Sequence, residues 1–488
     1  MGEELILTYD LGTTRLKVAA FSLDGELVGQ TTRRNTELSR GSSRWQAADD
    51  WWRDCIDTTV QLLADHAIEP AQLVGISLSG RAGATVFLDA DGVVIEDPWL
   101  DNRHASELGE MLSTFDAIPN YAAALIAKSK WLETNRPEVA SRVRWRLYAK
   151  DFLLFRMTGI AATDPASGPD GDWNEDWLAR ANLAPDQVPK VMLPWTIAGT
   201  LTNAAANTLG LIEGIPVAVG AHDGICANTG AGAITEGTMA ITLGTHCVAR
   251  MVTSQVPVGS LRFYSYPPNL NVIGGNALMA GRSLDWFLDT FTETGTVTGA
   301  LERDTKEANR QQRFRQMDDA VRDMKAGADD VMFVPHLGGQ LSPERRPAAK
   351  AIFYGMNSNT TRENLYRSVL EGACLAIADV VNQVIAWCGP PDRIGITGSG
   401  MKSDVWTSML ADVLDRPLEL TDAASEGRGA AIFCATALGR YPTLEDAIMQ
   451  MVKVSRIVKP DVERAGAYNE RHRKWHFLVD STRPLDGI

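Results

Sequence analysis

Two aspartates in this chain each follow a short apolar run, and both could take part in chemistry. Asp10 precedes the tripeptide Leu11-Gly12-Thr13, and Asp223 lies in the segment Gly220–Gly224, between glycines. A carboxylate at the tip of a strand is well placed to take a proton from a hydroxyl group. A carboxylate beside a phosphate needs a cation between them, and Mg²⁺ suits that role. The pair therefore indicates phosphoryl transfer, although either aspartate could be an ordinary turn residue.

The tripeptide Leu-Gly-Thr occurs again at Leu243-Gly244-Thr245, with apolar runs on both sides. Each copy predicts a strand, a tight glycine turn and a second strand. Glycine lets an anion approach the backbone N–H groups without a Cβ in the way, and Thr13 and Thr14 add hydroxyl groups. Either turn alone could be a plain hairpin, but two copies could hold the phosphates of one nucleotide between two domains.

A third glycine segment, Gly398-Ser399-Gly400, follows the apolar run RIGIT and precedes a helical pattern. Such a loop could approach a flat purine or an anion at a helix N-terminus. It does not fit the pattern G-x-G-x-x-G, so by itself it is weak evidence for nucleotide binding.

The surrounding sequence predicts an α/β protein. Three antiparallel strands begin it, with a turn at Asp24-Gly25, and a helix at 51–64 precedes a buried strand from Leu73. Residues 128–159 are predicted to be helical with a break near Pro137, and residues 163–176 to form a surface loop.

Chain length indicates two domains, because 488 residues exceed what one hydrophobic core usually supports. Glycines near 230–237 mark the boundary, so we expect domains at 1–233 and 234–488. The second domain repeats the order of strand, hairpin, helices and strand.

Composition bears on partners and compartment. The net charge of −14 argues against nucleic acid, and the basic cluster Arg471–Lys474 is predicted to be a solvated helix face. No apolar run approaches the length that spans a bilayer, and the chain opens on acidic residues. The six cysteines show no C-x-x-C pair, so neither disulfides nor structural zinc is expected. These features predict a cytoplasmic protein that binds no membrane.

Together these segments resemble the FGGY family of carbohydrate kinases, over nearly the whole chain. Further similar stretches are PWLDNR at 98–103, AKSKWLETNRPEV at 127–139, KDFLLFRMTG at 150–159, NALMAGRSLDWF at 276–287, FVPHLGGQLSP at 333–343, LEGACLAI at 370–377 and EGRGAAIFCATALGRY at 426–441. The resemblance implies a two-domain actin-like ATPase (ribonuclease H-like) fold with the active site in the interdomain cleft.

The resemblance also implies roles for individual residues. Asp223 is the expected general base, and Asp10 is expected to hold Mg²⁺ through water. The residues expected to bind ATP are Gly12, Thr13, Thr14, Gly244, Thr245, Gly281, Asp285, Gly398, Ser399, Gly400 and Ser403. The residues expected to bind a small sugar or polyol are Arg81, Ala82, Gly83, Trp99, Asp101, Arg103 and His222. Trp99, Asp101 and Arg103 could instead hold their loop together.

Three departures from the family pattern concern the ligands. In the segment 79–89, Arg81 replaces a glutamine and Gly83 a substrate-binding histidine of the xylulokinase branch, so the sugar site is not a standard xylulose or glycerol site. Ser399 replaces the middle glycine of the adenine loop. The loop Gly339–Pro343 lacks both charges of the usual G-E-R-S-P.

The sequence predicts an ATP- and Mg²⁺-dependent sugar or polyol kinase. An ATP-driven switch like actin or chaperone ATPases, and an inactive sugar sensor, are the alternatives, and the presence of both Asp10 and Asp223 favours the kinase. The sequence does not name the sugar or its reacting hydroxyl. It also leaves open the role of His246 and the oligomeric state, for which a homodimer is one option.

Overall fold

The computed structural model describes residues 3–115, 118–255, 262–266, 270–292, 303–421 and 424–486. The chain divides into two units. The first comprises Met1–Ile234, Tyr264–Asn271 and Ala424–Lys453, and the second comprises Thr235–Phe263, Val272–Ala423 and Val454–Ile488. The first long segment ends one residue beyond the sequence-based boundary, but the chain later returns to the first unit with Ala424–Lys453.

The first unit contains a seven-stranded sheet in the order β12-β13-β6-β1-β2-β3, with β14 paired to β6. β1 is antiparallel to β2 and parallel to β6, and β2 is antiparallel to β3. This confirms the three initial antiparallel strands. The strands are β1 (Leu5–Leu11), β2 (Arg15–Ser22), β3 (Leu27–Arg34), β6 (Leu73–Gly80), β12 (Ile197–Thr200), β13 (Pro216–Ala218) and β14 (Ala221–His222).

The second unit repeats this arrangement in a sheet of order β17-β18-β16-β15-β21-β22-β23. β15 is antiparallel to β16 and parallel to β21, as β1 is to β2 and β6. Each Leu-Gly-Thr turn connects the two strands of one hairpin, β1 to β2 in the first sheet and β15 to β16 in the second, and these two hairpins are equivalent. The strands are β15 (Thr238–Thr242), β16 (Cys247–Thr253), β17 (Arg262–Tyr266), β18 (Leu270–Ala277), β21 (Arg393–Thr397), β22 (Leu418–Leu420) and β23 (Arg456–Val458).

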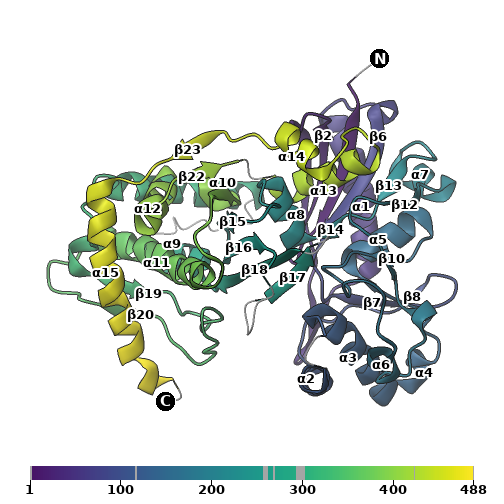
Figure 1. Cartoon of the computed structure of the whole chain (residues 1–488), viewed down its shortest axis with the longest axis horizontal. Coiled ribbons are helices and arrows are strands. Elements are labelled where there is room, and N and C mark those ends of the chain that lie inside the picture. Colours follow the sequence, from purple (N-terminus) through teal and green to yellow (C-terminus); the bar gives the residue numbers. More distant parts are fainter. Residues whose placement is uncertain are drawn as a thin grey trace. The chain divides into compact units, whose positions relative to one another are not determined.

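Helices cover both faces of the first sheet. On one face, Leu7 and Tyr9 pack into a hydrophobic core with Trp51 of α1 and Phe152 of α5. On the other face α13 lies against β1, β2 and β6, with α14 beside it (Figure 1). Side chains alternate along a strand, so Asp10, three residues after Leu7, lies on the α13 face. The helices of this unit are α1 (Ala48–Asp65), α2 (Ala105–Thr114), α3 (Asn120–Asn135), α4 (Pro137–Ala140), α5 (Ala149–Thr158), α6 (Glu175–Ala179), α7 (Asn203–Leu209), α8 (Asp223–Gly230), α13 (Ser425–Ala437) and α14 (Leu444–Met451).

Small residues let α8 and α13 pack closely. A Cβ on Gly429 would lie 2.0 Å from the carbonyl oxygen of Cys226, and one on Gly230 would lie 1.9 Å from that of Ser425. Both distances are far below van der Waals contact. The small residues of the segment 426–441 thus explain why this late piece of the chain belongs to the first unit.

The long helix of the second unit corrects one expectation. Among the described residues, α11 is the one helix long and apolar enough to cross a membrane, with an 18-residue stretch of mean hydropathy 1.6. The expectation that no apolar run approaches this length is therefore wrong. Most of that stretch, 72%, is buried inside the protein, and its side chains form the core of the second unit. The helices of this unit are α9 (Ala280–Phe291), α10 (Arg303–Val321), α11 (Arg362–Cys388), α12 (Asp404–Leu414) and α15 (Val462–Ser481).

Short strands complete the structure. Strands β4 (Leu38–Arg40) and β5 (Ser43–Trp45) form a hairpin, and β7 (Thr85–Leu88) pairs with both β8 (Val94–Glu96) and β9 (Trp145–Tyr148). β10 (Ala162–Thr163) pairs with β11 (Lys190–Val191), and β19 (Met332–Val334) with β20 (Ile352–Tyr354). The strand β9 corrects the prediction that residues 128–159 are helical apart from a break at Pro137.

The predicted surface loop at 163–176 is also partly wrong, because residues 162–169 are buried. Lys150 of α5 anchors them: its ammonium lies 2.6 Å from a carboxylate oxygen of Asp151 and 3.0 Å from one of Asp164. Asp164 also accepts hydrogen bonds from the backbone N–H groups of Ala166 and Ser167. The polar composition of this loop serves internal bonds rather than contact with water.

Candidate active site

Asp10 and Lys17 are direct neighbours across the β1–β2 hairpin, as the strand register requires. The Lys17 ammonium lies 3.1 Å from Asp10 Oδ2 and 3.4 Å from Glu426 Oε2, which comes from α13. Ser79 Oγ donates a hydrogen bond to the other oxygen of Asp10, at 2.8 Å. All four side chains therefore meet on the α13 face of the first sheet.

The electrostatics of this cluster favour cations. Burial raises the pKa of Asp10, Lys17 opposes the shift, and the neighbouring carboxylates Glu426 and Asp223 add to it. Burial disfavours the charge on Lys17, but Asp10 and Glu426 outweigh it and raise the pKa of the ammonium. Carboxylate oxygens are hard ligands of the kind that Mg²⁺ prefers, and Mg²⁺ usually keeps several of its waters. This donor set therefore fits a magnesium ion.

Asp223 is the first residue of α8, and the imidazole of His222 contacts its carboxylate. His222 Nε2 lies 3.1 Å from Asp223 Oδ1, and His222 Nδ1 accepts a hydrogen bond from the backbone N–H of Gly224 at 3.0 Å. An accepting Nδ1 leaves the proton on Nε2, so the imidazole donates to the carboxylate. The histidine ring is buried against Tyr121, whereas the side chain of Asp223 is 35% exposed. This arrangement fixes the carboxylate and leaves it reachable.

Arg81 directly follows β6 and lies near Asp223. Its Nη2 donates to Gln46 Oε1 at 2.7 Å, and its guanidinium lies 5.4 Å from the ring centre of Trp51. Gln46 in turn donates to the carbonyl of Thr13 in the first glycine turn. Burial lowers the pKa of Arg81 to about 10, although Asp223 and Glu37 favour its charge. Among the described residues, Arg81 Nε finds no acceptor.

A second buried cation lies near Arg81. The Lys128 ammonium donates to the carbonyl oxygens of Gly83 at 2.6 Å and Trp99 at 3.3 Å. Burial lowers the pKa of Lys128 to about 7, and Arg81 adds to the shift. Neither cation forms an ion pair with a carboxylate in the described part of the chain, although Asp223 and Glu37 favour the charge on Arg81 and Asp101 favours that on Lys128.

The predicted sugar residues of the segment 98–103 mainly make internal contacts. The Trp99 indole is buried between Phe87 and Trp131, with ring centres 5.7 and 5.3 Å away. Arg103 donates to both oxygens of Asp101, at 2.7 and 2.6 Å, and this pairing lowers the pKa of Asp101. These contacts favour the structural alternative for all three residues. Ala82 and Gly83, by contrast, are partly exposed.

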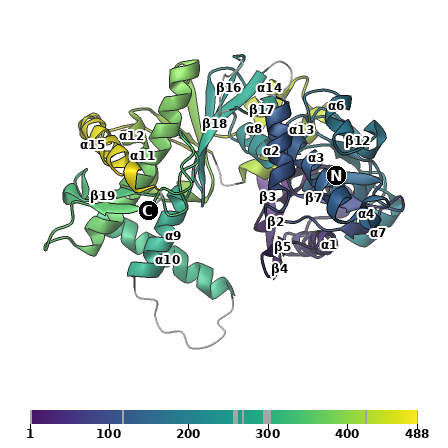
Figure 2. The same ribbon diagram turned by 90° about the horizontal axis from the view of Figure 1, so that it is seen from below.

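The second unit contains a pocket of about 210 Å³ that gathers five separate segments of the sequence. It is lined by seven of the residues predicted to bind ATP, namely Gly244, Thr245, Gly281, Asp285, Ser399, Gly400 and Ser403. Gly398 is not among the lining residues, and Gly12, Thr13 and Thr14 lie in the first unit. Figure 2 shows α9 and α10, two of the helices around this pocket, side by side.

Glycines make the close approaches around this pocket. A Cβ on Gly281 would lie 1.7 Å from the carbonyl oxygen of Gly244, and one on Gly400 would lie 2.5 Å from the Trp406 ring. Gly398 has φ +92°, a conformation that disfavours other residues. The backbone N–H of Arg282 donates to the carbonyl of Thr245, which joins the start of α9 to the glycine turn.

Polar side chains line one wall of the pocket in the second unit. Ser403 Oγ donates to Asp318 Oδ2 at 2.6 Å, and Tyr366 donates to Asp318 Oδ1 at 2.8 Å. Asp285 forms an ion pair with Arg310. Burial raises the pKa of Asp318, and the two hydroxyl donors oppose the shift. Sequence reasoning missed Asp318 and Arg310, because α10 matches no quoted motif.

His246 and the loop Gly339–Pro343, whose roles the sequence left open, each accept a hydrogen bond from a backbone N–H group. His246 Nδ1 accepts a hydrogen bond from the backbone N–H of Met279, at 3.5 Å, beside the start of α9. In the loop Gly339–Pro343, the Ser342 hydroxyl accepts from the backbone N–H of Asn276.

Sequence reasoning did not single out several charged or polar groups that contact the predicted site residues of the first unit or act on their charge, namely Lys17, Gln46, Lys128 and Glu426. Lys17 could have been found, since the predicted hairpin places it opposite Asp10. Glu426 begins the stretch EGRGAAIF, but nothing in the sequence shows that this segment returns to the first sheet.

These features define a class of protein: a two-unit α/β phosphotransferase with a repeated strand order, an acidic cluster in one unit and a glycine-lined pocket in the other. Residues 5–230 match the FGGY family of carbohydrate kinases, N-terminal domain, and residues 239–438 match the C-terminal domain of the same family. The chain belongs to this family and is a carbohydrate kinase.

Individual relatives agree with this assignment. The chain is 27% identical to a xylulose kinase of Escherichia coli, over 98% of the chain and 99% of the relative. It is 26% identical to a gluconokinase of Bacillus subtilis, over 92% and 90%. The structure of a xylulose kinase from Lactobacillus acidophilus superimposes with a TM-score of 0.84 at 20% identity and covers 98% of both chains. This similarity confirms the two-domain actin-like ATPase fold.

Proposed function

We propose that this kinase transfers the γ-phosphoryl group of ATP to a hydroxyl of a small sugar or polyol in the cytoplasm, with Asp223 as general base. The observation that carries the proposal is the meeting of Asp10, Arg81 and Asp223 in the first unit. Asp223 is held by His222 and is still reachable, and Arg81 and Asp10 supply a donor and a metal ligand near it.

In this mechanism the acceptor hydroxyl donates its proton to Asp223 while the phosphoryl group is transferred. His222 orients the carboxylate through Nε2, and the two glycine turns bind phosphate oxygens through backbone N–H groups. The pocket of the second unit receives the nucleotide. Asp10 would hold Mg²⁺ through water, and the bound ion would neutralise phosphate charge. Because the transition state is loose, positioning and charge stabilisation supply most of the rate.

Product analysis tests this proposal. The protein is incubated with Mg-ATP and each of a panel of ketoses, polyols and sugar acids, and the acceptors are then examined by mass spectrometry. We expect one acceptor to gain a single phosphate group. If no acceptor gains phosphate while ATP is consumed, the proposed transfer is wrong.

Asp10 should act by holding Mg²⁺ rather than by accepting the proton of the acceptor hydroxyl. We expect Asp10→Ala to raise the Mg²⁺ concentration needed for half-maximal rate, because a carboxylate ligand is lost. Asp223→Asn should leave that concentration unchanged, since Asp223 acts on the acceptor. The measurement is the initial rate against Mg²⁺ for the three proteins. The same dependence in all three would remove Asp10 from the metal site.

The acceptor should carry a carbonyl or carboxylate end near Arg81 and Lys128. Arg81 Nε has no acceptor among the described residues and could be satisfied by the ligand, and a charged guanidinium makes strong hydrogen bonds to anionic oxygens. Gly83 removes the imidazole that the xylulokinase branch uses. A relative named gluconokinase fits such an acceptor.

D-Xylulose and glycerol should therefore be poor acceptors. We expect the preferred acceptor to exceed both by about tenfold or more in kcat/KM, because buried donors left unpaired penalise a mismatched ligand. Arg81→Gln should erode this preference, and Arg53→Gln, which removes an exposed arginine of α1, should not. If D-xylulose is the best of the panel and Arg81→Gln leaves its kcat/KM unchanged, Arg81 is structural.

A further inference from the structure

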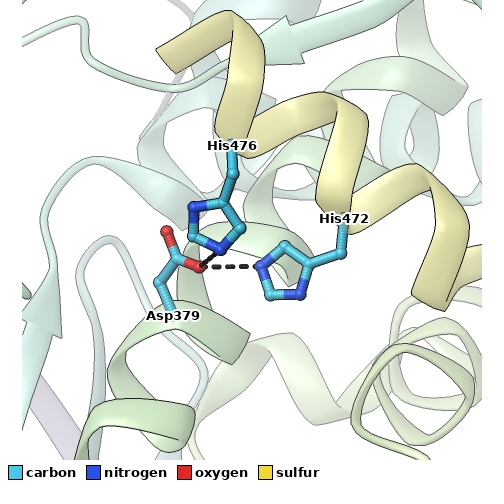
Figure 3. A group of neighbouring side chains, drawn as sticks. All are labelled: Asp379, His472 and His476. Atoms are coloured by element: carbon cyan, nitrogen blue, oxygen red, sulfur yellow. Dashed lines mark hydrogen bonds and ion pairs between the residues drawn. The ribbon is translucent and has the colours of Figure 1, made fainter. Parts of the chain in front are cut away.

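A buried carboxylate and two histidines meet where α15 lies against α11 in the second unit. His472 Nε2 lies 2.7 Å from Asp379 Oδ1, and His476 Nε2 lies 2.9 Å from the same oxygen. Figure 3 shows both imidazoles of α15 pointing at this carboxylate of α11. This arrangement corrects in part the prediction that the segment 471–474 is a solvated helix face: Arg473 and Lys474 are exposed, but Arg471 is buried on Glu371 and His472 turns inward.

The spacing along α15 explains why both rings reach the same group. Residues four apart in an α-helix lie on one face, one above the other. The rings of His472 and His476 are stacked, with centres 4.5 Å apart and planes inclined by 25°. The two nitrogens and the carboxylate oxygen all lie within 4.8 Å of one another. Three potential ligand atoms thus converge on one point.

We propose that Asp379, His472 and His476 bind a transition-metal dication, with Zn²⁺ as the representative ion, which fastens α15 to α11. Imidazole nitrogen and carboxylate oxygen are ligands that zinc accepts in tetrahedral sites. Neighbouring ligand atoms of such a site are about 3.3 Å apart, so the present separations must widen by only about 0.5 Å. The side chain of His476 is 51% exposed, which gives the ion a path and leaves room for water as the fourth ligand.

The local charges suit a cation. Burial alone would raise the pKa of Asp379, but the hydrogen bonds from His472 and His476 outweigh it and lower the pKa. The hydrogen bond to Asp379 in turn raises the pKa of His476, with a contribution from Asp480. The carboxylate therefore stays ionised, and protons on the imidazoles are the competitors that a metal must displace.

Two other basic groups lie near Asp379, and neither places an unpaired positive charge there that would compete with a metal ion. His336 lies in the wall of a small cavity that Asp379 also lines, and burial lowers its pKa to about 4, so it is neutral. Arg346, whose charge acts on His336, is paired with Asp486.

This site differs in chemistry from the proposed magnesium site. The acidic cluster of the first unit offers only oxygen ligands, whereas two imidazoles favour zinc, cobalt, nickel or copper over magnesium. Asp379 lies nine residues beyond Leu370, which lines the pocket of the second unit, so the two sites are more than two helical turns apart on α11. The expected role is stabilisation of the second unit.

Zinc binding by the full chain tests the proposal. The protein is first treated with a chelator, and free Zn²⁺ is then set with a chromophoric zinc chelator that reports competition. We expect one zinc ion per chain, bound about tenfold or more weakly in His476→Gln, His472→Gln and Asp379→Asn. His66→Gln, which removes an exposed histidine of the first unit, should bind as the wild type does.

Two further measurements keep the test decisive if Asp379→Asn fails to fold. His476 is half exposed, so His476→Gln should fold and keep its kinase activity. Zinc should raise the melting temperature of the wild type but not of His476→Gln, and Co²⁺ should give a visible tetrahedral spectrum only in the wild type. No stoichiometric binding by the wild type, or equal binding by His476→Gln, would overturn the proposal.

Discussion

Replacement of Asp223 by asparagine should lower kcat by at least about a hundredfold, the lower end of the effect of a general base. An amide has nearly the same shape but cannot accept the hydroxyl proton. His222 can still donate to the amide oxygen, so the local geometry should persist. ATP binding should change little, because seven of the predicted nucleotide residues line a pocket of the second unit, whereas Asp223 belongs to the first. Steady-state rates with the preferred acceptor and nucleotide titrations provide the two measurements.

A matched control is Asp170→Asn, which makes the same change at an exposed residue of the first unit. It should retain the wild-type kcat. More than a tenth of wild-type kcat in Asp223→Asn would show that another group takes the proton.

Lys150→Met should reduce the free energy of unfolding of the first unit by about 3–5 kcal/mol, the usual cost of removing one partner from a buried ion pair. Methionine keeps the unbranched shape of the side chain and all but its terminal atom, but the carboxylates of Asp151 and Asp164 would stay buried without their shared cation. Burial already raises the pKa of Asp151 to about 6, which shows how costly its charge is. Urea unfolding, followed by tryptophan fluorescence, measures the loss.

Lys130→Met provides the comparison. Lys130 pairs with Glu110 at 2.7 Å, but both side chains are partly exposed, and exposed pairs contribute about 0–1 kcal/mol. A loss of the same size in the two variants would mean that the Lys150 cluster is not a buried ion pair in solution.

Much of the fold could be predicted, because its signals are local. The alternation of apolar residues and the turn at Asp24-Gly25 predict the first hairpins, and the repeated Leu-Gly-Thr predicts the duplicated strand order. The segment 393–414 was predicted as strand, glycine loop and helix, and the structure confirms it. A glycine marks a turn or a close backbone contact at its own position in the sequence, so such features can be predicted without knowing the distant contacts.

The parts that could not be predicted depend on contacts between distant residues. Strand β9 forms through its pairing with β7, which lies about 60 residues earlier in the chain. The loop at 162–169 contains polar residues such as Asp164, and the pairing of Asp164 with Lys150 makes its burial favourable. The return of α13 to the first unit places Glu426 beside Lys17, 409 residues away in the chain. His472 looks like part of a basic surface cluster until Asp379 is known to face it. Family motifs supplied the aspartates and glycines, but not Lys17, and they assigned no role to Lys128 although the stretch 127–139 contains it.

The rate of ADP release, measured with and without acceptors, tests the central claim most directly. An enzyme that uses Asp223 to activate an acceptor hydroxyl should release ADP at least about tenfold faster with the preferred sugar than without it, since water is a poor substitute for a positioned acceptor. Asp223→Asn should abolish this increase. ADP release at the same rate with every acceptor and with none would contradict the account and favour an ATP-driven switch.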